Sequence, residues 1–200
     1  MSNNRKPLLL VLSAASGAGK SSLCRELLSR RSDIAYSVSC TTRAPRGGEI
    51  DGQSYHFLSQ EEFRCRVAKG DFLEYAEVHD NWYGTLRQTV EDAMAQGNSI
   101  VMDIDVQGAR QLRERLQQLP PDNLVRSGFV DIFIQVSSME ELRRRLAQRG
   151  EDTPEVIEKR LANAEREMAA VPEYRYTIVN DEFERAVAAL LGIIEKEQST

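Results

Sequence analysis

The stretch from Leu8 to Ser22 constrains the fold of this chain more than any other. It begins with an apolar run of strand length, LLLVL, passes through small residues and glycines, and continues into Lys20-Ser21 and a helical pattern of leucines. Small residues let successive backbone N–H groups close around phosphate oxygens, and the N-terminus of the following helix adds positive potential. The stretch therefore predicts a strand, a phosphate-binding loop and the start of a helix.

Lys20 and Ser21 are the two residues of this loop with predicted chemical roles. The lysine would reach the outer phosphates of a nucleotide, and the hydroxyl that follows it would bind Mg²⁺. One position departs from the usual pattern, because Ala14 stands where a first glycine is expected and lacks the freedom of glycine at positive φ. A secretory signal peptide led by Arg5 and Lys6 and a merely flexible glycine loop are disfavoured, because Gly-Lys-Ser-Ser continues into a helix.

Length and composition limit the class of protein. A chain of 200 residues with 41% hydrophobic residues can bury one core and needs no second domain. The net charge of −5 argues against a general nucleic-acid binder. No apolar run approaches membrane-spanning length, so we expect no membrane partner. The cysteines Cys24, Cys40 and Cys65 have no metal-ligand spacing, which indicates a reducing, cytoplasmic setting.

Predicted strands alternate with predicted helices along the chain. The strands are expected at 8–12, 34–39, 55–58, 72–78, 99–104, 129–136 and 176–180. The helices are expected from 23 to about 31, from a capping box at 59–62 to 70, from 86 to about 96, and at 111–118, 138–149, 154–170 and 182–196. Residues 40–49, 81–85 and 119–123 are predicted to be loops. This alternation predicts an α/β fold with a parallel sheet and right-handed crossovers.

Glu74 is unusual because it lies in a strand otherwise suited to a core. Alternation places Phe72, Glu74 and Ala76 on one face of that strand. A carboxylate can accept two parallel hydrogen bonds from the N1–H and N2 amino edge of guanine, an edge that adenine lacks. Glu74 is thus a candidate base reader, although a solvent-facing strand glutamate is the commoner outcome. Further candidates for polar contacts with the base are Ser39, Thr85 and Asp105.

Asp103 is the one charge in the apolar strand expected at 99–104. It falls toward the carboxyl end of that strand, which is where ligands bind in open α/β sheets. We therefore expect Asp103 to share a Mg²⁺ ion with Ser21.

Two groups of cations suggest anion sites. Arginines crowd the helix expected at 138–149, and Arg145 and Arg149 share a face of it, with Arg160 on the next helix. Mobile helices carrying these cations would form a lid over a triphosphate. The alternative is a solvated helix face paired with its own glutamates, which describes most charged helices.

A second anion site is suggested by a loop and two tyrosines. Arg43 and Arg46 lie in the loop, with Tyr55 and Tyr83 available as hydroxyl donors. Two phosphate sites in one small chain suggest transfer between them.

The two histidines, His56 and His79, lie in no nucleophile or metal arrangement and are expected to be structural or surface residues. Because no activated nucleophile is present, positioning and charge compensation would carry the chemistry.

Taken together, these motifs resemble the guanylate kinase family, of bacterial type, from about 7 to 196. The segment 37–46, SVSCTTRAPR, looks like the GMP-binding signature of that family, and 101–108, VMDIDVQG, looks like its second acidic motif. The resemblance implies an α/β P-loop kinase fold of three layers, with a parallel central sheet. It also implies a GMP-binding α+β insert at about 36–85 and a helical lid at about 139–170, with 1–6 as an N-terminal tail. The connector at 119–128 is longer than the family pattern.

The resemblance also implies a role for each matching residue. The ATP-binding loop would comprise Ala14, Ala15, Ser16, Gly17, Ala18, Gly19, Lys20, Ser21 and Ser22. Guanine would contact Ser39, Glu74, Thr85 and Asp105, and the GMP phosphate would contact Arg43, Arg46, Tyr55 and Tyr83. The catalytic cations would be Lys20, Arg43, Arg145, Arg149 and Arg160, with Mg²⁺ held by Ser21 and Asp103.

The expected activity is ATP:GMP phosphotransfer, with ATP and GMP or dGMP as small-molecule partners and a homo-oligomer as an open alternative to a monomer. Three other functions compete with it. An interaction module without catalysis is disfavoured by the intact Lys20, Ser21, Asp103 and Arg145. A kinase for another phosphate acceptor is disfavoured by Glu74 together with the loop arginines. A GTPase switch is the weakest, because no Asn-Lys-x-Asp base-reading motif occurs.

Overall fold

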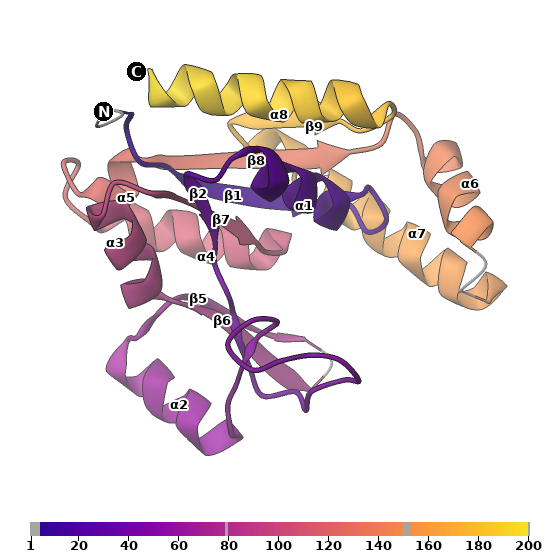
Figure 1. Ribbon diagram of the computed structural model, residues 1–200. Helices are drawn as coiled ribbons and strands as arrows, with labels where there is room; N and C mark the ends of the chain where they lie inside the picture. Colours follow the sequence, from indigo (N-terminus) through magenta and orange to yellow (C-terminus); the bar gives the residue numbers. More distant parts are fainter. Residues whose placement is uncertain (1–4, 79, 150–152, 200) are drawn as a thin grey trace.

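A parallel sheet forms the centre of the molecule, as the alternating pattern predicts. The computed structural model describes residues 5–78, 80–149 and 153–199. Within them, five strands form this sheet in the order β2 (Ile34–Tyr36), β7 (Ser99–Asp103), β1 (Leu9–Ala14), β8 (Phe129–Gln135) and β9 (Tyr176–Val179) (Figure 1). Every adjacent pair is parallel. The apolar run that begins β1 is fully buried, as expected for a strand covered on both faces.

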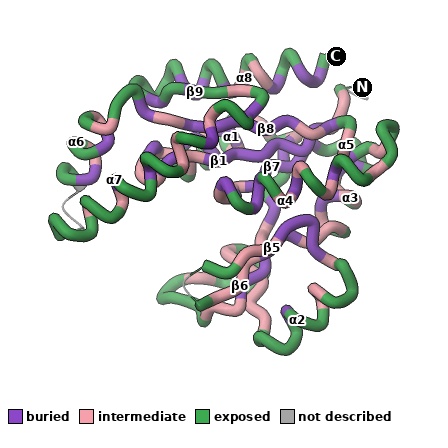
Figure 2. The backbone as a smooth tube through the Cα atoms, turned by 180° about the vertical axis from the view of Figure 1, so that it is seen from behind, coloured by how far each residue is buried: buried purple, intermediate pink, exposed green. Residues whose placement is uncertain are grey.

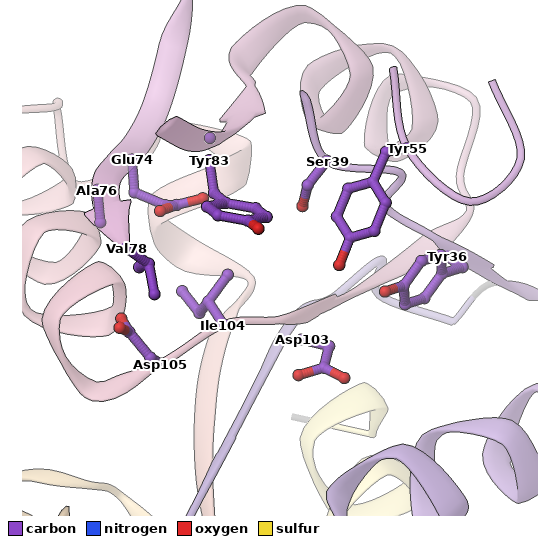
Figure 3. Close-up of a pocket in the computed structure, with 11 residues that line it drawn as sticks. Tyr36, Ser39, Tyr55, Glu74, Ala76, Val78, Tyr83, Asp103, Ile104 and Asp105 are labelled. Carbon is purple, nitrogen blue, oxygen red and sulfur yellow. The ribbon is translucent and has the colours of Figure 1, made fainter. Parts of the chain in front are cut away.

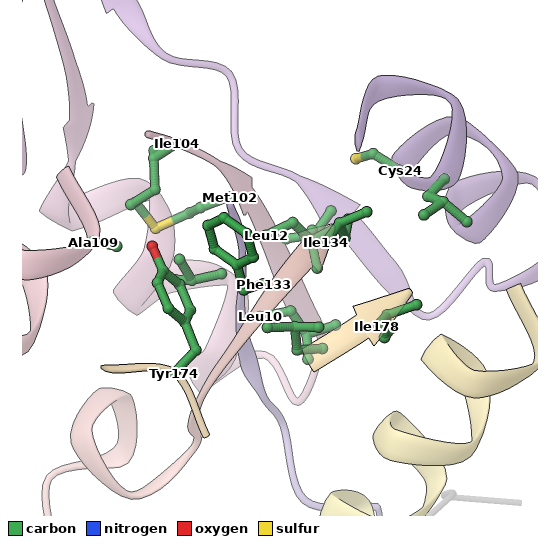
Figure 4. Packing of buried hydrophobic residues seen from close by; sticks show 14 of the residues in the cluster. Leu10, Leu12, Cys24, Met102, Ile104, Ala109, Phe133, Ile134, Tyr174 and Ile178 are labelled. Carbon is green, nitrogen blue, oxygen red and sulfur yellow. The ribbon is translucent and has the colours of Figure 1, made fainter. Parts of the chain in front are cut away.

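Helices cover both faces of this sheet. On one face lie α1 (Lys20–Arg30) and α8 (Phe183–Gln198), which pack against each other. On the other lie α3 (Arg87–Ala95), α4 (Val106–Gln117) and the short α5 (Leu124–Ser127). Leucine, isoleucine and phenylalanine side chains of the strands fill the space between these layers (Figure 4). The three-layer α/β fold is therefore confirmed.

A second, smaller sheet projects from the carboxyl ends of the central strands. Its order is β4 (His56–Phe57), β3 (Cys40–Thr41), β6 (Asn81–Leu86) and β5 (Phe72–Val78), and it is flanked by α2 (Gln60–Lys69). The predicted capping box opens α2 at Ser59. Phe63 of α2 stacks on Phe72, with their ring centroids 4.5 Å apart, and a small core of its own forms around this pair. The insert thus has packing that is separate from the central core.

Two helices project from the central sheet beyond the carboxyl end of β8. They are α6 (Met139–Arg149) and α7 (Pro154–Met168), which follow β8 and precede a short 3₁₀ turn at Val171–Glu173. Arg143 of α6 pairs with Glu158 of α7. Burial follows the central strands, whereas the outer parts of both helices are exposed (Figure 2). No helix among the described residues is long and apolar enough to cross a membrane.

The strand expected at 72–78 forms, but the prediction that Phe72, Glu74 and Ala76 lie on one face of it is wrong. Phe72 pairs with Leu86 and Glu74 pairs with Thr85, so Leu73 is an extra residue on β5. Such a bulge shifts the alternation of side chains by one position. Phe72 therefore joins the small core of the insert, while Glu74 and Ala76 line a cavity on the other side.

Other boundaries differ from the sequence prediction for identifiable reasons. Residues 81–85, predicted to be a loop, belong to β6, because antiparallel pairing with β5 overrides their turn-like composition. The strand expected at 34–39 ends at Tyr36, where the chain leaves the central sheet for the insert. The helix expected to begin at Gln111 begins at Val106, because the side chain of Asp105 caps it by accepting from the Gly108 N–H at 2.8 Å.

The connector and the start of α6 have further local features. The connector at 119–128 contains α5, which Asn123 caps through the N–H groups of Val125 and Arg126. At α6, Ser138 accepts from the Glu141 N–H, while the Glu141 carboxylate pairs with arginines of its own helix. His56 is half-buried in β4, while His79 and the residue that follows the helix expected at 138–149 lie outside the described residues.

Candidate active site

The loop between β1 and α1 encloses a cavity of 300 Å³. Gly17 and Gly19 adopt φ of 87° and 90°, a region in which side chains are strained. Ala14 ends β1 and has no positive φ, since Asp80 is the one such non-glycine residue in the described part of the chain. Alanine at that position therefore needs no backbone freedom that only glycine has. All the predicted ATP-binding residues line this cavity, namely Ala14, Ala15, Ser16, Gly17, Ala18, Gly19, Lys20, Ser21 and Ser22.

Residues distant in the sequence hold this loop in place. The side-chain amide of Asn180 donates to the Ala18 carbonyl at 2.7 Å. A Cβ atom on Gly19 would lie 2.5 Å from that amide nitrogen, and one on Gly17 would lie 2.9 Å from Leu142 of α6. The glycines are therefore required by close packing as well as by φ. Sequence reasoning missed Asn180, because no local pattern connects it with the loop.

Lys20 lies against the carboxyl end of β7. Its ammonium group pairs with Asp103 and donates to the Ile104 carbonyl at 3.1 Å. Strand β1, which leads into the loop that carries Lys20, pairs in parallel with β7, and Leu12 of β1 lies opposite Asp103. This pairing brings the predicted metal ligand to the predicted phosphate-binding lysine.

The oxygen atoms available at this place suit a magnesium ion that is shared with a substrate. Ser21 lies in the first turn of α1 beside the loop cavity, and Asp103 ends β7. Hydroxyl and carboxylate oxygens are hard ligands, and Mg²⁺ is commonly held by one or two protein oxygens together with phosphate and water. No cluster of three or more metal-ligating side chains occurs among residues 5–78, 80–149 and 153–199. The donor set therefore fits substrate-bound Mg²⁺ better than a metal site made by the protein alone.

Glu167 of α7 contributes an unexpected carboxylate to the loop cavity. Its Oε2 accepts from the Ser16 N–H at 2.7 Å, one of the backbone donors of the loop. Burial raises the pKa of Glu167, although the hydrogen bond from Ser16 opposes this. A helix of the predicted lid thus contacts the anion-binding backbone directly. No local pattern predicts this contact, since the partners are 151 positions apart in the sequence.

A second cavity of 270 Å³ lies between the central sheet and the insert. Five of the predicted GMP-binding residues line it, namely Ser39, Tyr55, Glu74, Tyr83 and Asp105. Figure 3 shows Glu74 on one side, with Tyr55 and Tyr36 on the other and Asp103 nearby. Asp105 lines both this cavity and the loop cavity. The two cavities therefore meet at the carboxyl end of β7.

Glu74 is a buried carboxyl group, with 5% of the residue exposed. The Thr85 hydroxyl donates a hydrogen bond to Oε1 of Glu74 at 2.7 Å. Thr85 does not line the cavity itself, so it supports the site through Glu74. The other oxygen lies against α4, where a Cβ atom on Gly108 would be 2.9 Å from it. Burial raises the pKa of Glu74 to about 7, and the hydrogen bond from Thr85 opposes this rise.

Arg43 is held in a defined position by Glu49. Both terminal nitrogens of its guanidinium group donate to the Glu49 carboxylate, at 3.0 and 2.8 Å. The same carboxylate accepts from the Arg46 N–H at 2.7 Å, which closes the loop. These hydrogen bonds lower the pKa of Glu49 to about 2. The guanidinium carbon of Arg43 lies 5.4 Å from the ring centre of Tyr55, so this arginine and the predicted tyrosines are brought together.

Glu49 is a functional candidate that sequence reasoning missed, because a loop without periodicity hides such pairs. The side chain of Arg46 is exposed, and Arg46 is not among the residues that line the two cavities.

The predicted lid arginines differ in their placement. Arg145 lies beside Gly17 and Gly19 in a cavity of 310 Å³, and it donates to Glu141 at 2.7 Å. Arg160 is half-buried on α7 and is not among the residues that line this cavity. The side chain of Arg149 lies outside the described structure.

Replacing Glu74 by glutamine is expected to stabilise the free protein at neutral pH. A buried carboxyl group with a pKa of about 7 is protonated in the folded state but ionised in the unfolded state between its ordinary pKa of 4.5 and 7. The folded state binds more protons than the unfolded state in this window. The contribution of the Glu74 carboxyl group to stability is therefore lost as the pH rises from 4.5 to 7. The free energy of unfolding of Glu74→Gln, relative to that of the parent, should therefore rise by about 3 kcal/mol between pH 4 and 8.

Urea unfolding of parent and variant across this pH range measures the difference directly. Glu77→Gln is the matched control, because Glu77 lies exposed on the same strand. A difference between Glu74→Gln and the parent that does not change with pH would contradict the assignment.

Comparison with known proteins agrees with the fold and identifies the family. Residues 5–197 match the family model described as guanylate kinase. The guanylate kinase of Alkalilimnicola ehrlichii is 49% identical over 185 residues, which is 92% of this chain and 86% of the relative. That of Symbiobacterium thermophilum is 46% identical over 199 residues, which is 100% of this chain and 90% of the relative.

A solved structure gives the same result. The crystal structure of guanylate kinase from Anaplasma phagocytophilum has a TM-score of 0.74 and 36% sequence identity, with coverage of 98% of this chain and 88% of that chain. The match spans the central sheet, the insert and the two projecting helices. By sequence and by structure, the chain belongs to the guanylate kinase family.

Proposed function

We propose that this protein transfers the γ-phosphoryl group of ATP to GMP and to dGMP, giving ADP and the corresponding diphosphate. The observation that carries the proposal is the pair of cavities that share Asp105. One is walled by a phosphate-binding loop, and the other contains a buried carboxyl group with an arginine-bearing loop nearby. Two nucleotides bound there would place their phosphates toward each other.

Recognition of guanine rests on Glu74. Its carboxylate would accept from the N1–H and the 2-amino group of the base, while adenine offers no such pair of donors. A buried site that must form hydrogen bonds rejects ligands that leave its polar groups unpaired. Because Glu74 addresses the base and not the sugar, we include dGMP among the substrates. Ser39 and Asp105, which line the same cavity, would supply further polar contacts.

The acceptor phosphate would lie near Arg43, Tyr55 and Tyr83. Arg43 offers planar guanidinium donors that Glu49 already orients. The exposed cation Arg46 would complete this site once a phosphate is bound. Since a monophosphate is largely ionised at neutral pH, its oxygen can attack without a general base.

In the transfer step, that oxygen forms a bond with the γ-phosphorus of ATP. The bond from phosphorus to the β–γ bridging oxygen breaks, and its electron pair leaves with ADP. Lys20 and the loop N–H groups would stabilise the charge on the donor phosphates, with Arg145, Arg149 and Arg160 approaching from the two projecting helices. Closure of these helices over the substrates would exclude water.

A Mg²⁺ ion bound to the phosphates of ATP would supply further charge neutralisation, held on the protein side by Ser21 and Asp103. For Asp103 to take this role, Lys20 must exchange its present contact with the carboxylate for a contact with phosphate.

The reaction is tested by measuring ADP formation from ATP and Mg²⁺ with GMP, dGMP, AMP, CMP and UMP offered separately. We expect turnover with GMP and dGMP only, because only guanine carries the two donors that Glu74 needs. Lys20→Ala, prepared in the same way, should be inactive and controls for contaminating kinases. Turnover with AMP, CMP or UMP comparable to that with GMP, or none with any acceptor, would refute the proposal.

A second prediction concerns ATP and Glu167. Its carboxylate occupies the Ser16 N–H and would repel a bound phosphate, so Glu167→Gln should bind ATP roughly fivefold to tenfold more tightly than the parent. Titration calorimetry with ATP measures the dissociation constant. Glu165→Gln, on the exposed side of the same helix, should leave it unchanged. Equal or weaker ATP binding by Glu167→Gln would show that the contact does not compete with ATP.

A further inference from the structure

Helix α4 lies along the free edge of β5. In the order β4, β3, β6, β5, the last strand has a neighbour on one side only within the described structure. The backbone N–H and C=O groups on its other side need partners when they are buried. Figure 1 shows α4 between this edge and the central sheet, and the two elements are in contact.

Two side chains of α4 provide these partners. Arg115 donates from Nη1 to the Phe72 carbonyl at 2.5 Å. Gln111 accepts from the Tyr75 N–H with its Oε1 at 3.3 Å. The guanidinium carbon of Arg115 also lies 5.1 Å from the ring centre of Tyr75. The backbone is thus held on both sides of Leu73 and Glu74.

The segment held in this way is the bulge itself. With Leu73 as the extra residue, Glu74 turns toward the cavity while Phe72 turns toward the small core of the insert. A slip of one residue would exchange these faces and take the carboxyl group out of the cavity. The two hydrogen bonds from α4 oppose such a slip, because they fix one backbone group on each side of the bulge.

The same helix also contacts the carboxyl group directly. Gly108 lies against Glu74 Oε2, and Gly108, Gln111 and Arg115 follow at spacings of three and four, which places them on one face of α4. The N-cap of this helix, Asp105, lines the cavity next to Glu74. One helix face therefore positions the carboxyl group, its backbone and a neighbouring polar residue.

We propose that Gln111 and Arg115 are positioning residues for guanine recognition, which hold the bulge of β5 so that the Glu74 carboxylate faces the base. The proposal rests on the proposed function, because it concerns the same base site. Neither residue lines the cavity. Both contact the backbone of β5, and the charge of Arg115 also lowers the pKa of Glu74, against the larger effect of burial. If instead the two hydrogen bonds only satisfied buried backbone groups, their loss would lower stability without changing base recognition.

The central variant is Arg115→Met, which keeps an apolar stem and removes the donors. We expect the KM for GMP to rise about tenfold, because one hydrogen bond from a charged donor is lost. The kcat and the KM for ATP should stay within about twofold of the values of the parent. Arg115→Lys should restore most of the GMP affinity, since an ammonium group can still donate to the carbonyl. Gln111→Leu, which removes the acceptor, should raise the same KM in the same direction.

Arg110→Met is the matched control. Arg110 lies on the same helix but is exposed and pairs with Glu173, away from β5. Its replacement should leave the KM for GMP unchanged. Thermal unfolding of all the variants, followed in parallel, shows whether each is folded at the assay temperature.

A double-mutant cycle separates positioning from general destabilisation. If Arg115 acts through Glu74, adding Arg115→Met to Glu74→Gln should change the KM for GMP by less than about twofold. An equal tenfold rise in both backgrounds, a parallel rise in the KM for ATP, or no rise in Arg115→Met would overturn this proposal while GMP phosphorylation by the parent still stood. A parent protein that fails to phosphorylate GMP would overturn both proposals.

Discussion

The parallel pairing of β1 with β7 is the constraint on which the site depends. It sets Leu12 opposite Asp103, so the phosphate loop after β1 and the acidic turn after β7 begin side by side. Lys20 can then contact Asp103 and the Ile104 carbonyl. The turn after β7 also ends in Asp105, which caps α4 and lines both cavities. One strand pair thereby brings together the two cavities and helix α4, which contacts Glu74.

Three glutamates hold the binding groups of this site. Glu49 pairs with Arg43, Glu167 accepts from a backbone N–H of the phosphate loop, and Glu74 is buried at the base site. The first orients a cation, the second occupies a backbone donor that a phosphate would use, and burial raises the pKa of the third to about 7. In the proposed function, Glu74 and Glu167 are therefore expected to lower the stability of the free protein and its affinity for ATP, respectively. Such a compromise is typical of functional sites.

Local patterns in the sequence predicted much of this arrangement. The phosphate loop, the capping box of α2 and the bounds of β5 each follow from residues within a few positions of one another. The strand β6 was not predictable in this way, because its composition is turn-like and it becomes a strand only by pairing with β5. The bulge at Leu73 was not predictable either, because it depends on the register between the strands and not on composition.

Several supporting contacts between distant segments could not be predicted from the sequence. Asn180 at Ala18, Glu167 at Ser16 and Arg115 at Phe72 are joined only by the topology of the fold. The residue types and the resemblance to a family both predicted Glu74 as a base reader and the loop arginines as phosphate ligands, roles that belong to the proposed function. Neither indicated what holds these residues, because supporting contacts leave no motif of their own.

The central claim is that the buried carboxylate of Glu74 selects guanine. The most direct measurement is the ratio of kcat/KM for GMP to that for AMP, in the parent and in Glu74→Gln. A glutamine amide can accept one guanine donor but opposes the other, and it can donate to the N1 of adenine. The ratio should therefore fall by at least about 100-fold, with the KM for ATP unchanged. A ratio equal to that of the parent would show that another group reads the base.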